Sequence, residues 1–579
     1  MTRPHGLITF DISRSRLRKV AALGLLALGS AAALAQGGRP APAAVLPSAF
    51  ADSAVAAAAR RTTAPLLSGL DGNPFPIKSR DSRVRRYFDQ GMQLVFGFNP
   101  VEAARSFEAA LAIDPACAAC WWALAWSLGP NINSDMTPQA ARRIDSALRQ
   151  ARRHAQRATP VQRALIEALA LRHPGGQRID EAAYAQRLRS LVRHHPRDAN
   201  VALLAAEALM NLHPYDWWKP GGAPQPWTPE IEALLERAMA LQPRHAGAHH
   251  YWIHLQESSP HPQRAVASAD FLRDAVPGSG HLLHMPAHID MRVGHFDAAV
   301  RANQRSIEAD LRYLTQVDAQ GAYRVGYVAH NHHFLWAAAS MAGDAALALQ
   351  AAQAAWPAAC GPSGRDPGTA IAQQYAVLPL FALVRFGQWD TLLRGTRPPD
   401  SPAPYPQAIW HYARGTAYVR SSQPDAAQRE LARLEQLAAE PALATLKVKN
   451  LNPVAQLARI AVLTLSADLA SARGEAAQAV TLLREATRIE DAFEYDEPHL
   501  WLAPTRHALG AALLAAGQAA QAEQVYRQDL AHYPDNGWSL NGLTQALEAQ
   551  GRAAQAQQAR EAARKAFGRD QPLPLASRF

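Results

Sequence analysis

The chain has 579 residues and a formal net charge of +10. This length exceeds what a single hydrophobic core fills, so we expect either several domains or a repeat array. The basic residues are mostly arginines spread along the chain without a basic block, which argues against nucleic acid as a partner. Alanine is abundant and apolar residues recur every three or four positions, which predicts an almost wholly helical protein.

The first predicted element is a secretory signal peptide over residues 1–35. A basic region around Arg14 and Lys19 precedes an apolar run from Val20 to Leu34, and the small residues before Gln36 suit a cleavage site. The run is too short for a membrane span, and no later segment reaches about 18 uninterrupted apolar residues. We therefore predict a periplasmic or secreted protein without a transmembrane segment.

Residues 36–78, rich in Ala and Pro, are predicted to be a disordered lead-in to the helices. The following helices contain Cys117-x-x-Cys120. In an oxidising compartment this pair can form a short bridge at a helix start; the alternative is two small buried residues in a repeat. Trp121 stands where a haem-attachment motif requires histidine, which excludes that motif.

A repeating pattern of small residues, aromatic residues and helix-ending prolines is visible at both ends of the helical region. In the front part it comprises Ala103, Phe107, Ala110, Pro115, Trp121 and Leu124, and near the C-terminus Gly510, Ala522, Tyr526 and Pro534. Gly517 and Gly551 recur after 34 residues. This pattern and period resemble the tetratricopeptide repeat (TPR) superfamily, and with the signal peptide an exported bacterial TPR protein.

The resemblance implies an all-α fold, a tetratricopeptide-type α-solenoid of about a dozen antiparallel helix pairs forming a superhelix with a concave groove. It also implies a small molecule, a peptide or a protein as the partner in that groove. We divide the helical region into N-terminal units (79–197), central His-rich units (198–358), C-terminal units (359–567) and a tail (568–579).

A long interruption of the helical pattern runs from His213 to Trp227. It carries Tyr215, Trp217 and Trp218 among prolines and glycines. A loop so aromatic predicts a lid or plug over the groove, with Trp217 and Trp218 as ligand candidates; simple packing is the alternative.

Histidines gather in three short helical segments of the central units, with Glu257 one turn after the first segment. The histidines are His249, His250, His254, His281, His284, His288, His330, His332 and His333. When units are taken to begin at Ala199, Ala246, Gly280 and Ala329, most of these histidines and Glu207 fall at equivalent positions of their units. Second positions hold His281 and His330, fifth positions His250, His284 and His333, and ninth positions Glu207, His254 and His288. In the family these positions generally face the groove, so the resemblance implies one common patch.

Imidazole is the commonest transition-metal ligand, and two histidines four residues apart bind one ion from a single helix face. We therefore predict a transition-metal site, for Zn, Cu or Fe, made by His250, His254, His281, His284, His288, His330 and His333. Glu207 and Glu257 are candidates for a general base or for orienting an imidazole ring. The alternatives are a polar groove for a peptide or anionic ligand, and ordinary packed histidines.

Three asparagines and an acidic loop lie near this candidate site. Asn131, Asn133 and Asn331 are groove candidates, although asparagine is more often a cap or turn residue. The loop from Glu494 to His499 could fold over the groove, but we expect it to be solvated.

Functions of different classes remain open from the sequence. One is an exported solenoid that binds a metal and a ligand or protein partner; another is a metal-dependent hydrolase or oxidase with its site inside the superhelix; a third is a metal-free binding scaffold. The sequence has no Gly-rich phosphate loop, no Gly-x-Ser-x-Gly elbow and no His-Glu-x-x-His helix, so no motif names a reaction.

Overall fold

The computed structural model describes residues 64–72, 75–219, 221–317, 319, 323–361, 368–396, 403–449, 451–501, 503–568 and 577–579. The predicted signal peptide lies outside the described residues, as do most of the predicted lead-in and most of the tail. Cellular location therefore stays a prediction. All described residues belong to one compact unit.

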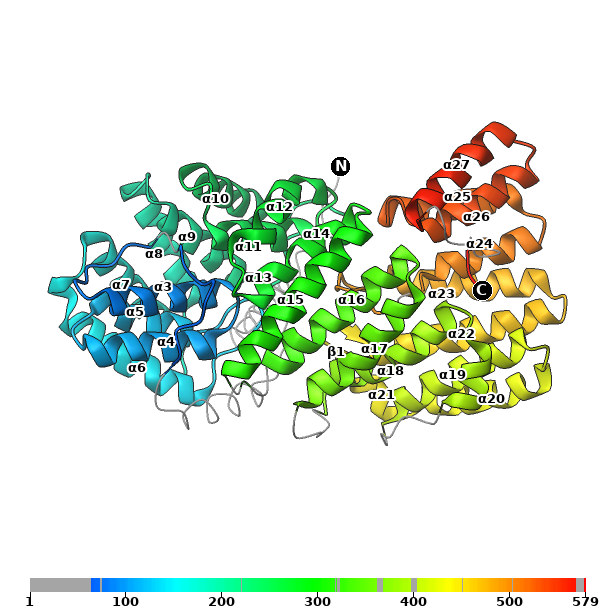
Figure 1. The fold of residues 1–579 in the computed structure, drawn as a ribbon, viewed down its shortest axis with the longest axis horizontal. Helices are drawn as coiled ribbons and strands as arrows, with labels where there is room; N and C mark the ends of the chain where they lie inside the picture. The colour runs from blue at the N-terminus through cyan, green and yellow to red at the C-terminus, as the bar shows by residue number, and fades with distance from the viewer. Residues whose placement is uncertain are drawn as a thin grey trace, which may run out of the picture. The chain divides into compact units, whose positions relative to one another are not determined.

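Consecutive helices pack against each other in pairs, which Figure 1 follows from blue to red. The N-terminal pairs are α3 (Ser82–Phe96) with α4 (Pro100–Ile113), α5 (Ala118–Ser127) with α6 (Pro138–Arg153), α7 (Pro160–Arg172) with α8 (Glu181–His194), and α9 (Ala199–Leu212) with α10 (Thr228–Leu241). A short 3-10 turn, η1 (Ala155–Arg157), precedes α7. Side-chain caps fix several starts: Thr159 and Gln162 form a reciprocal capping box at α7.

The central pairs carry the candidate site. They are α11 (Ala246–Glu257) with η2 (Pro262–Ala265) and α12 (Val266–Ala275), α13 (Gly280–His284) and α14 (Pro286–Arg292) with α15 (Phe296–Gln316), and η3 (Arg324–Val328) and α16 (Ala329–Ala342) with α17 (Ala345–Cys360). Helices begin at Ala199, Ala246, Gly280 and Ala329, which confirms the four predicted unit starts. Between α13 and α14 the helix is interrupted at Pro286, which has no amide N–H to continue the ladder.

The C-terminal pairs include one small strand element. They are α18 (Ala370–Arg385) with η5 (Thr391–Gly395), α19 (Pro404–Arg420) with α20 (Pro424–Ala438), α22 (Val454–Ala472) with α23 (Ala476–Asp491), α24 (Thr505–Ala515) with α25 (Ala519–His532), and α26 (Gly537–Ala549) with α27 (Ala553–Ala566). Before α22 lie α21 (Pro441–Thr445) and an antiparallel hairpin of β1 (Lys447–Val448) and β2 (Asn452–Pro453). The helical pattern did not predict this hairpin.

The aromatic residues of the repeat pattern pack against small residues of neighbouring helices at both ends of the chain. A Cβ added to Gly510 would lie 2.3 Å from the ring of Tyr526, and one added to Gly91 would lie 2.4 Å from the ring of Phe107. Interiors packed at this density leave no room for a methyl group, so both glycines are required by helix-to-helix packing. The structure thus confirms an all-α, TPR-like solenoid of stacked helix pairs.

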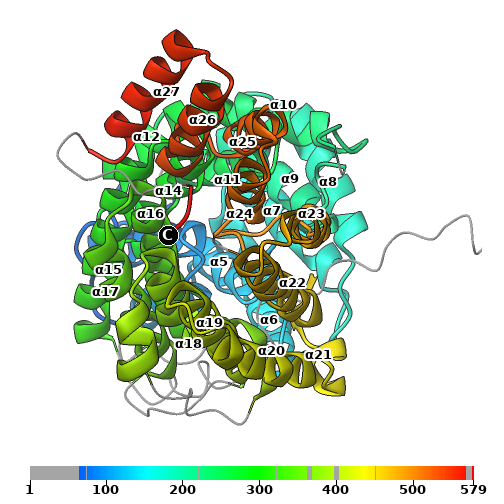
Figure 2. The same cartoon turned by 90° about the vertical axis from the view of Figure 1, so that its right-hand side faces the viewer.

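The C-terminal units pack back onto the central units. Trp538 of α26 donates its indole N–H to the carbonyl of Ser340 in α16 at 3.0 Å. Figure 2 shows where the helices α16 and α26 lie in the fold. Gln374 of α18 donates its side-chain amide to the carbonyl of Leu500 at 2.8 Å. These contacts bring the segment between α23 and α24 to the central histidines.

The two neighbouring cysteines are bonded. Cys117 and Cys120 form a disulfide at the start of α5. Of the two interpretations that the sequence left open, the structure shows the bridge.

Among the described helices, α22 has the length and hydropathy of a membrane span. Its 19 residues have a mean hydropathy of 1.3 over their most apolar window, and 72% of that window is buried. The burial comes from neighbouring helices, since α22 packs against α19, α20 and α23.

Candidate metal centre

Six histidines from three consecutive units meet in the interior of the protein. The helix α11 supplies His250 and His254, α13 and α14 supply His281, His284 and His288, and α16 supplies His330. Each has 9% or less of its surface exposed, so none faces an open groove. The sequence placed these residues on one patch, and the structure brings them together.

Three of these histidines, His250, His254 and His281, form what we call the first trio. Their possible ligand atoms all lie within 4.8 Å of one another. The Nε2 atoms of His250 and His281 are 3.0 Å apart. The Nε2 atom of His254 is buried and has no hydrogen-bond partner among the described residues.

The second trio consists of His284, His288 and His330, with ligand atoms again within 4.8 Å. The Nε2 atoms of His284 and His288 are 2.8 Å apart. The Nδ1 atom of His284 lies 2.7 Å from Oδ1 of Asn303, whose amide nitrogen donates to the carbonyl of Ala299. Since Oδ1 of Asn303 can only accept, His284 carries its proton on Nδ1 and leaves a lone pair on Nε2.

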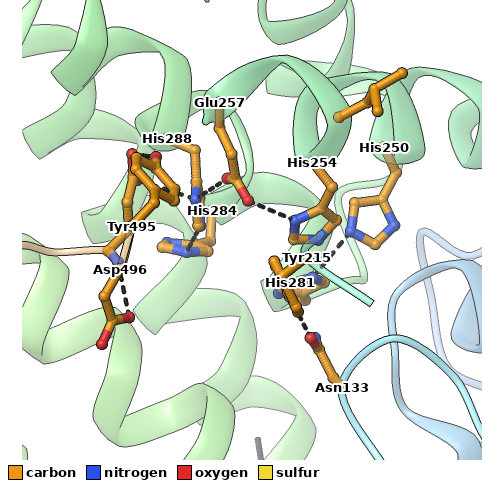
Figure 3. Close-up of polar contacts among 12 residues, drawn as sticks. Asn133, Tyr215, His250, His254, Glu257, His281, His284, His288, Tyr495 and Asp496 are labelled. Atoms are coloured by element: carbon orange, nitrogen blue, oxygen red, sulfur yellow. Dashed lines mark hydrogen bonds and ion pairs between the residues drawn. The ribbon is translucent and has the colours of Figure 1, made fainter. Parts of the chain in front are cut away.

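One carboxylate lies between the two trios. Glu257, the last residue of α11, places Oε1 3.0 Å from Nδ1 of His254 and Oε2 2.5 Å from Nδ1 of His288 (Figure 3). A second carboxylate, Glu497, lies 3.0 Å from the same nitrogen of His288. A carboxylate on the Nδ1 side of an imidazole fixes the ring and leaves its Nε2 for a metal ion.

Burial and neighbouring charges shift the pKa values of these groups in opposite directions. Burial lowers the pKa of His250, His281, His284 and His330 well below the ordinary value, so these rings are neutral ligands. Burial also acts to lower the pKa of His288, but Glu257 and Glu497 outweigh it and raise this pKa to about 9. Burial raises the pKa of Glu497 to about 7, although His288 opposes the change.

A small cavity adjoins both trios. Its volume is about 80 Å³, and its lining includes His254 and His281 from the first trio and His288 and His330 from the second. The other polar lining residues are Asn133, Tyr215, Glu257, Tyr327, Tyr375, Lys449, Tyr495, Asp496 and Glu497. A cavity of this size holds a few non-hydrogen atoms and is far below the roughly 300–1,000 Å³ of drug-sized pockets.

The aromatic loop predicted as a lid packs over this region. Tyr215 lines the cavity and donates its hydroxyl to Oδ1 of Asn133, as Figure 3 shows. Trp218 donates its indole N–H to the carbonyl of Leu255 in α11 at 2.7 Å, and Trp217 is fully buried. Neither tryptophan lines the cavity, so Tyr215 is the residue of this loop that a ligand there would meet.

The acidic loop is where our sequence-based expectation was wrong. Instead of being solvated, Asp496 and Glu497 are 6% and 7% exposed and line the cavity. Lys449, at the tip of the hairpin, pairs with the carboxylate of Asp496 and donates to the carbonyl of Glu497 at 3.2 Å. The loop is held inside because the C-terminal units pack back onto α16 and α18.

Several predicted residues lie apart from the two trios. His333 stacks on Trp336 and meets Tyr375 edge to face, and neither of its ring nitrogens has a hydrogen-bond partner among the described residues. Asn331 donates to Oδ2 of Asp310 at 2.7 Å. Asn131 accepts from the backbone N–H of Asn133 at 2.8 Å, the turn role typical of asparagine.

Glu207 is also apart from the histidines. Its carboxylate accepts from the indole N–H of Trp126 at 3.3 Å and from the side chain of Asn211 at 3.0 Å, and it does not line the cavity. Burial raises its pKa from 4.5 to about 7, although Arg172 opposes the change. Of the two predicted carboxylates, the structure brings only Glu257 to the histidines.

We expect Glu207→Gln to change the pH dependence of stability without changing metal content. Because the pKa of Glu207 is raised to about 7 in the folded protein, ionising it costs stability as pH rises from about 4.5 to 7. Glutamine does not titrate, so the variant should gain stability relative to the wild type across this window, by at most about 3 kcal/mol. Chemical denaturation at several pH values checks this; a constant difference between the two proteins would contradict it.

One face of α15 supports the site from behind, and the sequence analysis missed it. Asn303 accepts from His284, Ser306 donates to the carbonyl of Gly280 at 2.7 Å, and Asp310 accepts from Tyr323 and Asn331, both at 2.7 Å. The polar residues at 303, 306 and 310 recur at helical spacing, and this pattern could have revealed a buried polar face.

Gly280 gives a direct test of this support. A Cβ at Gly280 would lie 2.0 Å from Oδ1 of Asp310, so alanine there must displace α13 or the Asp310 carboxylate. We expect Gly280→Ala to cost about 1–3 kcal/mol of stability and to weaken metal binding, because His281 and His284 follow on the same short helix. Denaturation and metal titration of the variant check both parts. Gly517→Ala, at a turn glycine with open space, is the control for the site effect.

Comparison with known proteins assigns no family. No family model and no curated protein matches the sequence. Among solved structures, the human IFIT1 dimer with m7Gppp-AAAA aligns at a TM-score of 0.30 and 12% identity, covering 85% of this chain and 92% of that one. The human IFIT1 dimer with PPP-AAAA aligns at a TM-score of 0.28 and 11% identity, with the same coverage. At such TM-scores the similarity says nothing about a ligand.

Proposed function

We propose that the protein binds transition-metal ions through the two histidine trios and presents them to a small ligand in the adjoining cavity. The observation that carries the proposal is the pair of Nε2 atoms of His284 and His288, 2.8 Å apart. Asn303 fixes the lone pair of His284 on Nε2. Nδ1 of His288 faces two carboxylates that raise the pKa of this ring to about 9, so in the metal-free chain its Nε2 carries a proton directed at the lone pair of His284. A metal ion bound between the two nitrogens would take the place of that proton.

The first trio supports the same conclusion independently. Glu257 accepts the Nδ1 proton of His254, so the buried Nε2 of His254 presents a lone pair that has no partner among the described residues. An unpartnered buried polar atom is costly unless something binds it. Two imidazole nitrogens bonded to one ion at about 2.0–2.1 Å lie about 2.8–3.4 Å apart, a range that includes the 3.0 Å between His250 and His281.

The charges around the cavity also favour cations. The lining contains three carboxylates, from Glu257, Asp496 and Glu497, and one ammonium, from Lys449. Buried charges require compensation, and Lys449 is already paired with Asp496. His288, whose pKa is raised to about 9, is the cation that faces Glu257 and Glu497 in the metal-free chain, and a metal ion that displaces its proton would supply that positive charge instead. Imidazole ligands without thiolates suit Zn, Cu or Fe rather than Mg or Ca.

Export belongs to this proposal as a separate part. It rests on the basic region and apolar run of residues 1–35, and a periplasmic or secreted location suits the disulfide between Cys117 and Cys120. Expression with residues 1–35 intact, followed by fractionation and N-terminal sequencing, tests it.

Metal analysis of protein purified without an affinity tag tests the binding function. We expect near-stoichiometric transition metal in the wild type, and less in His284→Ala and His250→Ala. His333→Gln is the matched control, because this histidine is equally buried but belongs to neither trio. A wild-type protein that carries no transition metal and takes up neither Zn²⁺ nor Cu²⁺ would overturn the proposal.

The cavity favours a metal-dependent enzyme as a second candidate. Both trios face it, and the hydroxyl of Tyr215 and the ammonium of Lys449 lie at its wall. An ion with three imidazole ligands keeps a position open, which is typical of catalytic rather than structural sites. Azide added to the Cu²⁺-loaded protein should change its visible spectrum; an unchanged spectrum would indicate a closed shell and count against an enzyme.

A further inference from the structure

We infer that the centre holds two ions, one in each trio, and that the carboxylate of Glu257 couples them. This inference rests on the proposed metal binding and adds the number of ions, the ligands of each and the residue that joins them. The repeat supplies the same three ligand positions in two successive places along the chain.

Each trio is built in the same way from two neighbouring units. The fifth and ninth residues of one unit give a pair four residues apart, and the second residue of the next unit gives the third imidazole. In the first trio these are His250, His254 and His281; in the second they are His284, His288 and His330. Because stacked repeats place equivalent residues equivalently, two equal ligand sets make two equal sites.

The same positions in the flanking units show why the array ends after two sites. Before the first trio, the corresponding residues are Leu203, Glu207 and Gly247, which include no imidazole. After the second trio they are His333, Ala337 and Ile371, so His333 has no companion. This explains why the structure leaves both Glu207 and His333 outside the centre, although the sequence register included them.

The two trios lie side by side and share one cavity. Ring centroids of His254 and His288 are 5.9 Å apart, as are those of His281 and His284. This separation across the trios is close to the 6.0 Å between His288 and His330 within one trio. Two imidazoles of each trio line the cavity, so a ligand inside it can contact both ions at once.

Glu257 joins the sites because each of its oxygens contacts a different trio. Oε1 orients His254 and Oε2 orients His288 (Figure 3), and both contacts leave Nε2 free for an ion. Among the histidines of the two trios, Glu497 pairs with His288 and with no other. Removing the Glu257 carboxylate should therefore weaken the binding of both ions, whereas removing that of Glu497 should weaken only the binding of the ion in the second trio.

A different arrangement would place an ion between the carboxylates. The atoms of Glu257, Glu497 and Nδ1 of His288 also lie within 4.8 Å of one another. The 2.5 Å between Nδ1 of His288 and Oε2 of Glu257 is shorter than the roughly 2.8–3.4 Å between two ligands of one ion. We therefore assign both carboxylates to orienting His288.

The cavity also defines the ligand class. Two cations facing about 80 Å³ of space, beside tyrosine hydroxyls and Lys449, suit a small anion of two to four non-hydrogen atoms. Such a ligand can bridge the two ions.

The experiment measures ions per chain in the full protein, stripped with a chelator and then titrated with Zn²⁺ alone. We expect two ions in the wild type. His250→Ala/His281→Ala and His284→Ala/His330→Ala should each retain one. Glu257→Gln should weaken both binding steps by about 10–100-fold, and Glu497→Gln only one of them. His333→Gln and Glu207→Gln are the controls and should retain two.

The outcomes separate this inference from the proposed function. One ion in the wild type, or loss of both ions when either trio is removed, would overturn the two-site inference but leave metal binding standing. Three ions would indicate a further ion between Glu257, Glu497 and His288, and this result would also overturn the two-site inference. No ion at all would overturn the proposed function itself. With Cu²⁺, the paramagnetic resonance signal per copper should fall when the second ion binds, because two neighbouring copper spins couple. Circular dichroism checks that each variant folds.

Discussion

His288→Ala is expected to destabilise the metal-free protein by about 3–5 kcal/mol, more than any other single change at the centre. His288 is the cation that Glu257 and Glu497 share, since these carboxylates raise its pKa to about 9. Without it, two buried carboxylates face each other with no cation between them. The midpoint of chemical denaturation at pH 7, in the presence of a chelator, measures the loss.

A second variant distinguishes this charge effect from the loss of packing. In the background of Glu497→Gln, one of the two carboxylates is neutral, so His288→Ala should cost clearly less there than in the wild type. An equal cost in both backgrounds would mean that His288 stabilises the protein through packing alone.

Removing the metal ions should produce the second large effect. A ligand that binds the folded but not the unfolded chain raises the free energy of unfolding by about 4 kcal/mol when its free concentration is 1,000 times the dissociation constant. Two occupied sites raise it by correspondingly more. We expect the melting temperature to fall by several degrees when a chelator is added and to recover with Zn²⁺. Differential scanning calorimetry at fixed protein concentration makes the measurement.

The control for ion removal is a variant that lacks one imidazole of each trio, His250→Ala/His284→Ala. Its melting temperature should be the same with chelator and with Zn²⁺. A chelator effect of equal size in this variant would show that the ions bind elsewhere, and no effect in the wild type would contradict binding at the trios.

The helical repeat was predictable because its signals are local. Small and aromatic residues such as Gly510 and Tyr526 recur at fixed spacing. The starts of α11 and α13 are one 34-residue unit apart, and Gly343 sets the start of α16. The pairing of histidines four residues apart is equally local, since helix geometry alone puts them on one face.

The remaining parts of the centre depend on contacts between distant segments. Glu497 lies 209 residues after the histidine it contacts, and it is buried because Trp538 and Gln374 anchor the C-terminal units to the central ones. Nothing in the acidic sequence around Glu494 distinguishes a buried loop from a solvated one. The polar face of α15 was missed for a similar reason, because its partners lie on other helices.

The sequence by itself determined the helical repeat and a set of seven histidines and two glutamates that contains the six clustered histidines and Glu257, because helix periodicity and repeat register fix which residues share a face. Only the tertiary structure decided how those histidines divide into two trios, why Glu207 and His333 are outside them, and which loop closes the cavity. These features depend on how whole units stack and on where the C-terminal units pack back onto the central ones. Such packing is made by contacts between elements distant in sequence, which local sequence patterns do not specify.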